Sequence, residues 1–132
     1  MRLDQSFDRF NRELRRRHGI TGAQLAMLRI LAEREPVTLA RLRAELAMHP
    51  ATLGQLIERI ARAGLVVRAP DPDDRRRRVL RVTTRGWALL VKAPLAGPVR
   101  LRTARLDPDR LVRLAEAFED AVVLFGMEEW AA

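Results

Sequence analysis

The chain has 132 residues, a net charge of +8 and no cysteine. This length has room for one domain with an added oligomerisation element. The absence of cysteine excludes disulfides, thiol-based sensing and zinc sites built on cysteine. No apolar run approaches the roughly 18–20 residues that span a bilayer, and residues 1–17 lack the apolar centre of a secretory signal, so we expect a cytoplasmic protein.

The charges are distributed unevenly along the chain. Residues 68–85 carry seven arginines against three aspartates, whereas residues 107–132 carry two arginines against seven acidic residues. The basic stretch in the middle suggests a surface for a polyanion such as DNA, and the acidic stretch at the end suggests a surface for a different partner.

The first predicted element is a helix over residues 3–18. We assign residues 1–19 to dimerisation, with packing on the chain's own domain as the alternative reading. The evidence is one apolar stripe with spacings of four, three and four, formed by Leu3, Phe7, Phe10 and Leu14.

Three more helices are predicted before the basic stretch. Thr21 caps the first of them, which ends at a Glu-Pro pair, and Thr38 caps a short second one. Pro50 suits the first turn of the third, and Gly64 suits the left-handed position after its end. His49 stands at the N-cap of this third helix and stabilises its start only if the imidazole accepts a hydrogen bond.

A β-hairpin is predicted over residues 65–82. Two short runs rich in Val and Leu flank a turn cluster, Pro70–Asp74, and four consecutive arginines, Arg75–Arg78, follow it. A tip rich in guanidinium groups is poorly suited to a core and well suited to a phosphate backbone or a narrow groove.

Strand alternation assigns directions to these arginines. It places Arg75 and Arg77 on one side of the hairpin and the other two arginines on the opposite side. We expect Asp73 and Asp74 to brace the loop by pairing with the arginines that do not face outward.

Residues 87–132 are predicted to form the C-terminal helices. A fifth helix, capped by Thr83 or Thr84, is interrupted by a segment rich in proline and glycine, and a last helix starts after an Asp-Pro pair. Trp87 lies on the apolar stripe of the fifth helix and is expected in the core.

The second and third of the helices before the hairpin form a helix-turn-helix candidate. The face of the later helix that lacks large apolar side chains is suited to DNA, because Gln bonds adenine bidentately, a Thr methyl touches thymine and Arg meets phosphates. A solvated helix face shows the same pattern, but the basic hairpin beside it favours DNA. The residues on this face are Thr52, Gln55, Arg59 and Arg62.

The stretch from Ile20 to Gly86 resembles the DNA-binding core of the MarR family (multiple antibiotic resistance regulators). The resemblance implies a mainly α fold with a small β-hairpin wing. A winged helix-turn-helix core, residues 20–86, is then flanked by N- and C-terminal dimerisation helices. The matching segments are Ile20-Thr21, Leu39–Leu46, His49–Leu53, Gly64-Leu65-Val66 with Arg68, Asp71–Arg76 and Val82–Gly86.

The resemblance also implies a function, that of a sequence-specific transcription regulator. It implies a homodimer that binds a pseudo-palindromic operator in double-stranded DNA and acts as a repressor responsive to a small aromatic or lipophilic effector. Carried over by position, the base-edge contacts are Pro50, Ala51, Thr52 and Gln55, the phosphate contact is Arg59, and the wing contacts are Arg75, Arg76 and Arg77.

Other readings remain open at this point. An apolar group near Phe7, Phe10, Ile20, Met27 and Trp87 forms either an effector cavity or solid core. The main alternative function is a winged-helix module for protein–protein interaction without sequence-specific DNA binding, in which the acidic C-terminal helix is the working surface. No catalytic constellation, phosphate loop or metal-ligand set is visible, so we expect neither an enzyme nor a cofactor or metal site.

Overall fold

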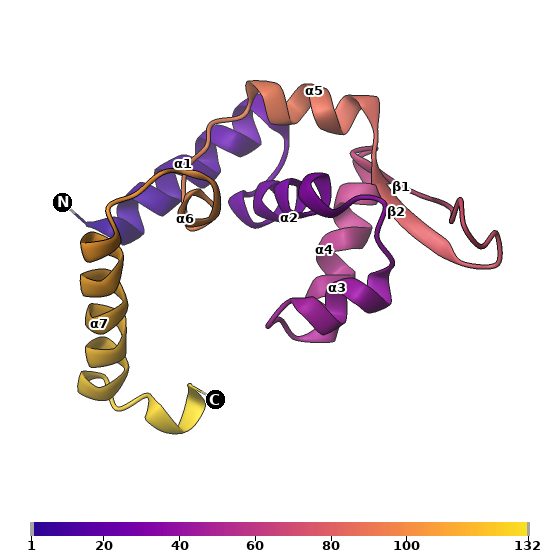
Figure 1. The fold of residues 1–132 in the computed structure, drawn as a ribbon. Coiled ribbons are helices and arrows are strands. Elements are labelled where there is room, and N and C mark those ends of the chain that lie inside the picture. The colour runs from indigo at the N-terminus through magenta and orange to yellow at the C-terminus, as the bar shows by residue number, and fades with distance from the viewer. Residues whose placement is uncertain (1, 132) are drawn as a thin grey trace. The chain divides into compact units, whose positions relative to one another are not determined.

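The computed structural model describes residues 2–131, apart from the side chain of Thr103, and is mainly helical with one two-stranded sheet (Figure 1). It divides into two compact units, Met1–Val99 and Arg100–Ala132. The predicted fold class, mainly α with a hairpin wing, is confirmed. The elements are α1 (Leu3–His18), α2 (Gly22–Arg34), α3 (Leu39–Glu45), α4 (Pro50–Arg62), β1 (Val66–Pro70), β2 (Arg78–Val82), α5 (Thr84–Lys92), α6 (Arg100–Thr103), α7 (Pro108–Leu124) and the short 3-10 helix η1 (Glu128–Trp130).

Side-chain caps set the helix starts where the sequence predicts them. The Thr21 hydroxyl accepts a hydrogen bond from the N–H of Gln24 at 3.2 Å. In return, Oε1 of the Gln24 side chain accepts one from the N–H of Thr21 at 3.0 Å, which completes a capping box. Thr38 caps α3, and Thr83 rather than Thr84 caps α5. These bonds satisfy backbone donors that have no partner inside the helix.

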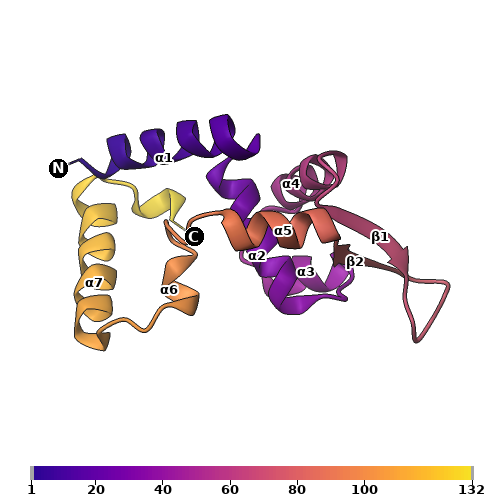
Figure 2. The same cartoon turned by 90° about the horizontal axis from the view of Figure 1, so that it is seen from above.

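The core of the first unit surrounds α2, which contacts α1, α4, α5 and β2 (Figures 1 and 2). The apolar side of α2, formed by Leu25, Leu28 and Leu31, packs on the apolar face of α4, so the two helices bury these faces against each other. This packing fixes the position of α4 relative to the rest of the unit. The most deeply buried side chains are Leu14, Leu25, Met27, Leu28, Leu31, Leu42, Leu53, Ile57, Ile60 and Leu65.

The hairpin is anchored along both edges of β2. On one side β1 pairs antiparallel with β2, in a register that runs from Val66 opposite Val82 to Pro70 opposite Arg78. On the other side the N–H of Leu80 donates to the Val37 carbonyl at 2.7 Å, and the N–H of Val82 donates to the Glu35 carboxylate. The base of the wing is therefore tied to the segment between α2 and α3, while its tip extends beyond the helices (Figure 2).

A glycine allows α5 to pack on the base of the wing. A Cβ at Gly86 would lie 2.3 Å from the Leu65 carbonyl oxygen and 2.6 Å from Cγ1 of Val82, closer than real Cβ contacts. The contact joins the first turn of α5 to both ends of the hairpin. Because the obstruction includes backbone, a side chain could be admitted only by moving the hairpin or the helix.

One prediction about α5 is wrong. Trp87 is 44% exposed rather than in the core, because its helix presents that face away from the first unit's packed interior. The helix ends at Lys92 as predicted, before the segment that contains Pro94, Gly97 and Pro98.

The second unit consists of α6, α7 and η1. The Asp107 carboxylate accepts the N–H of Asp109 at 3.0 Å and caps α7 as predicted. No residue of α7 is buried: its Phe118 is 58% exposed, and Phe125, directly after the helix, is 77% exposed. This helix therefore leaves its apolar stripe uncovered within its own unit.

Candidate nucleic-acid interface

The first part of the candidate site is the outward face of α4. Its inner face buries Leu53, Leu56, Ile57 and Ile60 in the core, so the residues at other angles of the helix must face away. Its start is fixed by Pro50 in the first turn and by His49, whose Nδ1 accepts the N–H of Ala51 at 3.2 Å. The predicted residues are all exposed there: Pro50, Ala51, Thr52, Gln55, Arg59 and Arg62.

The two arginines of α4 have different surroundings. Nη2 of Arg62 lies 2.9 Å from Oε1 of Glu58, one turn earlier on the same face. Arg59 has no ion-pair partner among residues 2–131. The sequence reasoning had not placed Glu58 at the site, although its spacing of three from Gln55 and four from Arg62 puts it on the same face.

The second part of the site is the tip of the wing. Arg75 and Arg76 lie in its turn, exposed, and their side chains have no ion-pair partner in the described part of the chain. Arg77 is held from two sides, with Nη2 at 3.3 Å from Asp71 and Nε at 4.0 Å from Asp74. The tip thus presents two free guanidinium groups on a loop that a third one helps to shape.

Two expectations for the wing need correction. Arg75 to Arg77 lie in the turn rather than in β2, so strand alternation does not decide where they point. The bracing carboxylates are Asp71 and Asp74, whereas Asp73 contributes its backbone N–H, which donates to Asp71 at 3.0 Å. The carboxylate of Asp74 likewise accepts the N–H of Arg76 at 3.0 Å.

Asp71 is the wing residue that the sequence reasoning missed. It is only 8% exposed, and its N–H donates to the Arg77 carbonyl at 2.9 Å. A signal was available, because an aspartate at the end of a strand and two residues before another turn residue is typical of an Asx turn. Its burial, however, depends on how the loop folds back over β1.

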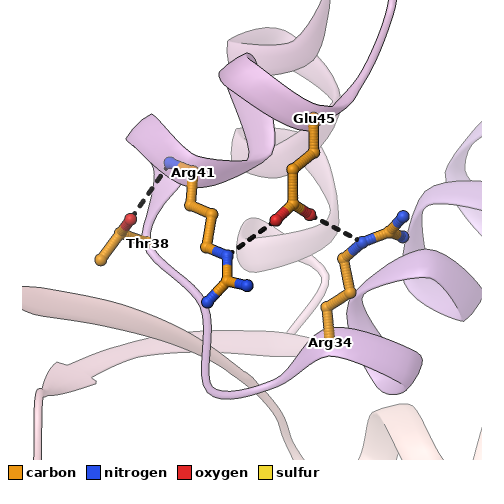
Figure 3. A network of polar contacts seen from close by, with 4 residues as sticks. All are labelled: Arg34, Thr38, Arg41 and Glu45. Carbon is orange, nitrogen blue, oxygen red and sulfur yellow. Dashed lines mark hydrogen bonds and ion pairs between the residues drawn. The ribbon is translucent and has the colours of Figure 1, made fainter.

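A polar network joins the end of α2 to α3, the first helix of the helix-turn-helix (Figure 3). The Glu45 carboxylate accepts Nε of Arg34 at 3.0 Å and Nε of Arg41 at 2.7 Å, and so joins the end of α2 to both ends of α3. The hydrogen bond from Arg41 is the main cause that lowers the pKa of Glu45, and Arg34 adds to it. The carboxylate therefore stays charged at neutral pH and holds the two helices together.

A second arginine of α2 reaches the segment after α5. Nη2 of Arg29 donates to the carbonyls of Ala93 at 3.0 Å and Pro94 at 3.3 Å. Burial lowers the pKa of this guanidinium from its ordinary value, but Arg remains charged at any physiological pH. The bonds fix where the chain leaves α5.

Two of the hollows beside α1 in the first unit bear on the predicted effector cavity. The apolar group expected to form either an effector cavity or solid core does not stay together, because Ile20 and Met27 are buried in the core and Trp87 is exposed. Phe10 borders both hollows. One, of about 190 Å³, is lined by Phe10, Glu13, Leu14, Arg17, His18, Lys92 and Pro94, and the other, of about 170 Å³, by Leu3, Ser6, Phe7, Phe10, Ala96 and Gly97.

Within residues 2–131, no helix combines the length and the apolar character that crossing a membrane requires.

Comparison with known proteins agrees with this geometry. Residues 18–77 match the model of the MarR family, and no curated protein gives a significant match. The matched residues contain α2 to α4, β1 and the wing tip.

Solved structures share the fold over most of the chain. A mutant MarR of E. coli complexed with operator DNA matches with a TM-score of 0.62 at 24% identity, over 90% of this chain and 87% of that one. The S. aureus MepR–DNA complex matches with a TM-score of 0.65 at 17% identity, over 92% and 89%. The transcription regulator MarR from Oenococcus oeni PSU-1 matches with a TM-score of 0.61 at 20% identity, over 90% and 91%. The winged helix-turn-helix region of this chain, residues 18–77, therefore matches the model of the MarR family, and these solved structures share its fold.

Proposed function

We propose that this protein is a sequence-specific transcription regulator that binds double-stranded DNA as a homodimer. The observation that carries the proposal is the pairing of two exposed surfaces on one braced scaffold. One is the face of α4 with Thr52, Gln55 and Arg59. The other is the wing tip, where the side chains of Arg75 and Arg76 have no ion-pair partner among residues 2–131.

Each surface has a distinct role in this proposal. The start of α4 enters the major groove, where Gln55 and Thr52 contact base edges together with Pro50 and Ala51. Arg59 and Arg62 then meet phosphates further along the helix. The wing places Arg75, Arg76 and Arg77 at the adjacent minor groove, where a narrow groove attracts guanidinium groups.

The terminal segments supply the dimer in this proposal. The apolar stripe of α7 is uncovered within its own unit, and Phe125, 77% exposed and seven residues after Phe118, continues it. A helix with an uncovered apolar stripe gains from a second copy that buries it. A dimer presents two α4 helices and thereby selects a pseudo-palindromic operator with half-sites about one helical turn apart.

The proposed effector is a small aromatic or lipophilic molecule, and the regulator acts as a repressor that the effector releases from DNA. The hollow beside Phe10, Leu14 and Pro94 supports this, since it has an apolar floor and lies against the α2-bound segment after α5. Release of a bound operator by added aromatic compounds tests this part of the proposal.

Selection from random duplexes with the purified protein at two salt concentrations tests DNA reading. Enrichment of an inverted repeat is the expected result. Binding that falls with salt but enriches no motif would leave only a non-specific basic protein. Absence of binding at low salt would instead favour a protein–protein interaction module that works through the acidic α7.

A further inference from the structure

The outward face of α4 carries one acidic residue among its proposed DNA contacts. Glu58 follows Gln55 by three residues and precedes Arg62 by four, so all three side chains lie on the same face of the helix. The side chain of Glu58 is 60% exposed and that of Arg62 is 75% exposed. A carboxylate at this place meets any duplex that α4 meets.

This carboxylate differs from the acidic groups that brace the fold. Glu45 joins α2 to α3 through two arginines, and Asp71 and Asp74 fix the wing loop through Arg77 and backbone N–H groups. Within residues 2–131, Glu58 forms its ion pair inside its own helix, with Arg62 one turn away. Pairs of this kind contribute only about 0.3–0.5 kcal/mol to a helix, so helix stability gives little reason for an acid here.

The charge has a larger effect on a bound polyanion. In the free protein Glu58 holds the guanidinium of Arg62 at 2.9 Å and so competes with phosphates for it. On a duplex in a wrong register its negative charge faces phosphate oxygens, and repulsion adds to the lost contact. In a correct register the carboxylate lies beside base edges in the groove, where base amino groups and water can donate hydrogen bonds to it in place of Arg62.

We propose that Glu58 is a selectivity residue: it weakens binding to non-cognate DNA by withholding Arg62 and repelling phosphates, and so increases discrimination without being needed for affinity at the operator. The inference rests on the proposed DNA-binding function. It differs from a base-reading role, in which Glu58 would be required for operator affinity.

The test compares Glu58→Gln, which keeps the size of the side chain and removes its charge, with Glu129→Gln, which makes the same change of net charge in the exposed η1. Fluorescence anisotropy gives the Kd for the most enriched duplex and for a shuffled duplex of the same composition, across a salt series. Arg62→Gln and the double variant Glu58→Gln/Arg62→Gln complete a cycle. Circular dichroism and the mass of the dimer establish that each variant is folded and assembled.

The expected result is confined to non-cognate DNA. Glu58→Gln lowers the Kd for the shuffled duplex by about five- to tenfold and steepens its salt dependence by about one unit of slope. Its Kd for the enriched duplex changes by less than about threefold, and Glu129→Gln changes either Kd by less than about twofold. Adding Arg62→Gln to Glu58→Gln removes the extra unit of slope.

Two results would overturn the inference while leaving the proposed function in place. Equal tightening on both duplexes would make Glu58 a general charge only, and loss of operator affinity without a gain on shuffled DNA would make it a base-reading residue. Failure of the unaltered protein to bind either duplex, or to enrich any motif, would overturn the proposed function and this inference with it.

Discussion

Asp71 and Arg77 close the wing loop by two contacts at once. Oδ2 of Asp71 lies 3.3 Å from Nη2 of Arg77, and the N–H of Asp71 donates to the Arg77 carbonyl at 2.9 Å. The Asp71 side chain also accepts the N–H of Asp73. The free arginines of the tip, Arg75 and Arg76, are thus carried by a loop whose ends are joined through one buried carboxylate.

Asp71→Ala should destabilise the protein by about 1–3 kcal/mol, because it leaves the part-buried N–H of Asp73 and the Arg77 guanidinium without their acceptor. Urea unfolding measures the change, and hydrogen exchange at the Asp73 amide locates it. The matched control is Asp73→Ala, which removes an exposed carboxylate and is expected to change stability by less than about 0.5 kcal/mol. Equal losses in the two variants would mean that Asp71 does not hold the loop.

Gly86→Ala should be far more destabilising than its small change of volume suggests. The added methyl group meets the Leu65 carbonyl oxygen at 2.3 Å, so α5 or the hairpin has to move, at a cost of about 1–3 kcal/mol or more. Gly54→Ala, in the middle of α4 where a Cβ meets nothing within 4 Å, should instead stabilise by about 0.5–1 kcal/mol. Urea midpoints of the two variants should shift in opposite directions.

The network around Glu45 predicts a pH dependence of stability. Arg41 and then Arg34 hold the pKa of Glu45 below its ordinary value of 4.5. The unfolded chain therefore binds the proton more readily, and this contribution to stability is present above pH 4.5 and is lost as the pH falls through the folded pKa. Thermal unfolding of Glu45→Gln should lie below that of the parent at pH 7, and the difference should shrink in acid. A difference that does not depend on pH would contradict the prediction.

Arg76→Ala and Gln55→Ala should affect DNA binding in different ways. Removal of Arg76 weakens binding to all sequences and lowers the salt slope by about one unit, because a phosphate or groove cation is lost. Removal of Gln55 relaxes the preference at one base pair, at a cost of about 1–3 kcal/mol. Binding to a panel of single-base operator variants separates the two effects. An unchanged preference profile in Gln55→Ala would mean that α4 is oriented otherwise.

Local signals account for the part of the structure that the sequence could predict. Thr21, Thr38 and Asp107 cap helices because a short side chain reaches a donor two or three residues later, within one segment of chain. The apolar face of α4 follows from its spacing alone. Even the unusual cap of His49 could be stated as a condition, and its imidazole meets that condition.

The rest depended on contacts between distant segments. The stripe position of Trp87 is the same whether or not another element covers it, and here its side chain is 44% exposed. Asp71, Asp73 and Asp74 are the same residue type within one short loop. Only the path of that loop decides which of them is buried against Arg77. The position of Glu58 follows from its spacing from Gln55 and Arg62, but an acidic residue is not a type that DNA binding predicts on that face.

The attachment of β2 to Glu35 and Val37 determines how the two DNA-facing surfaces can work together. These bonds hold the wing on the segment that leads into α3, so the wing and α4 keep a fixed separation and orientation. The protein then recognises the spacing between the stretches of duplex that the wing and α4 contact, as well as the base sequence. One base pair inserted between those stretches shifts the second stretch along and around the DNA axis. The wing cannot follow this shift because it is fixed relative to α4.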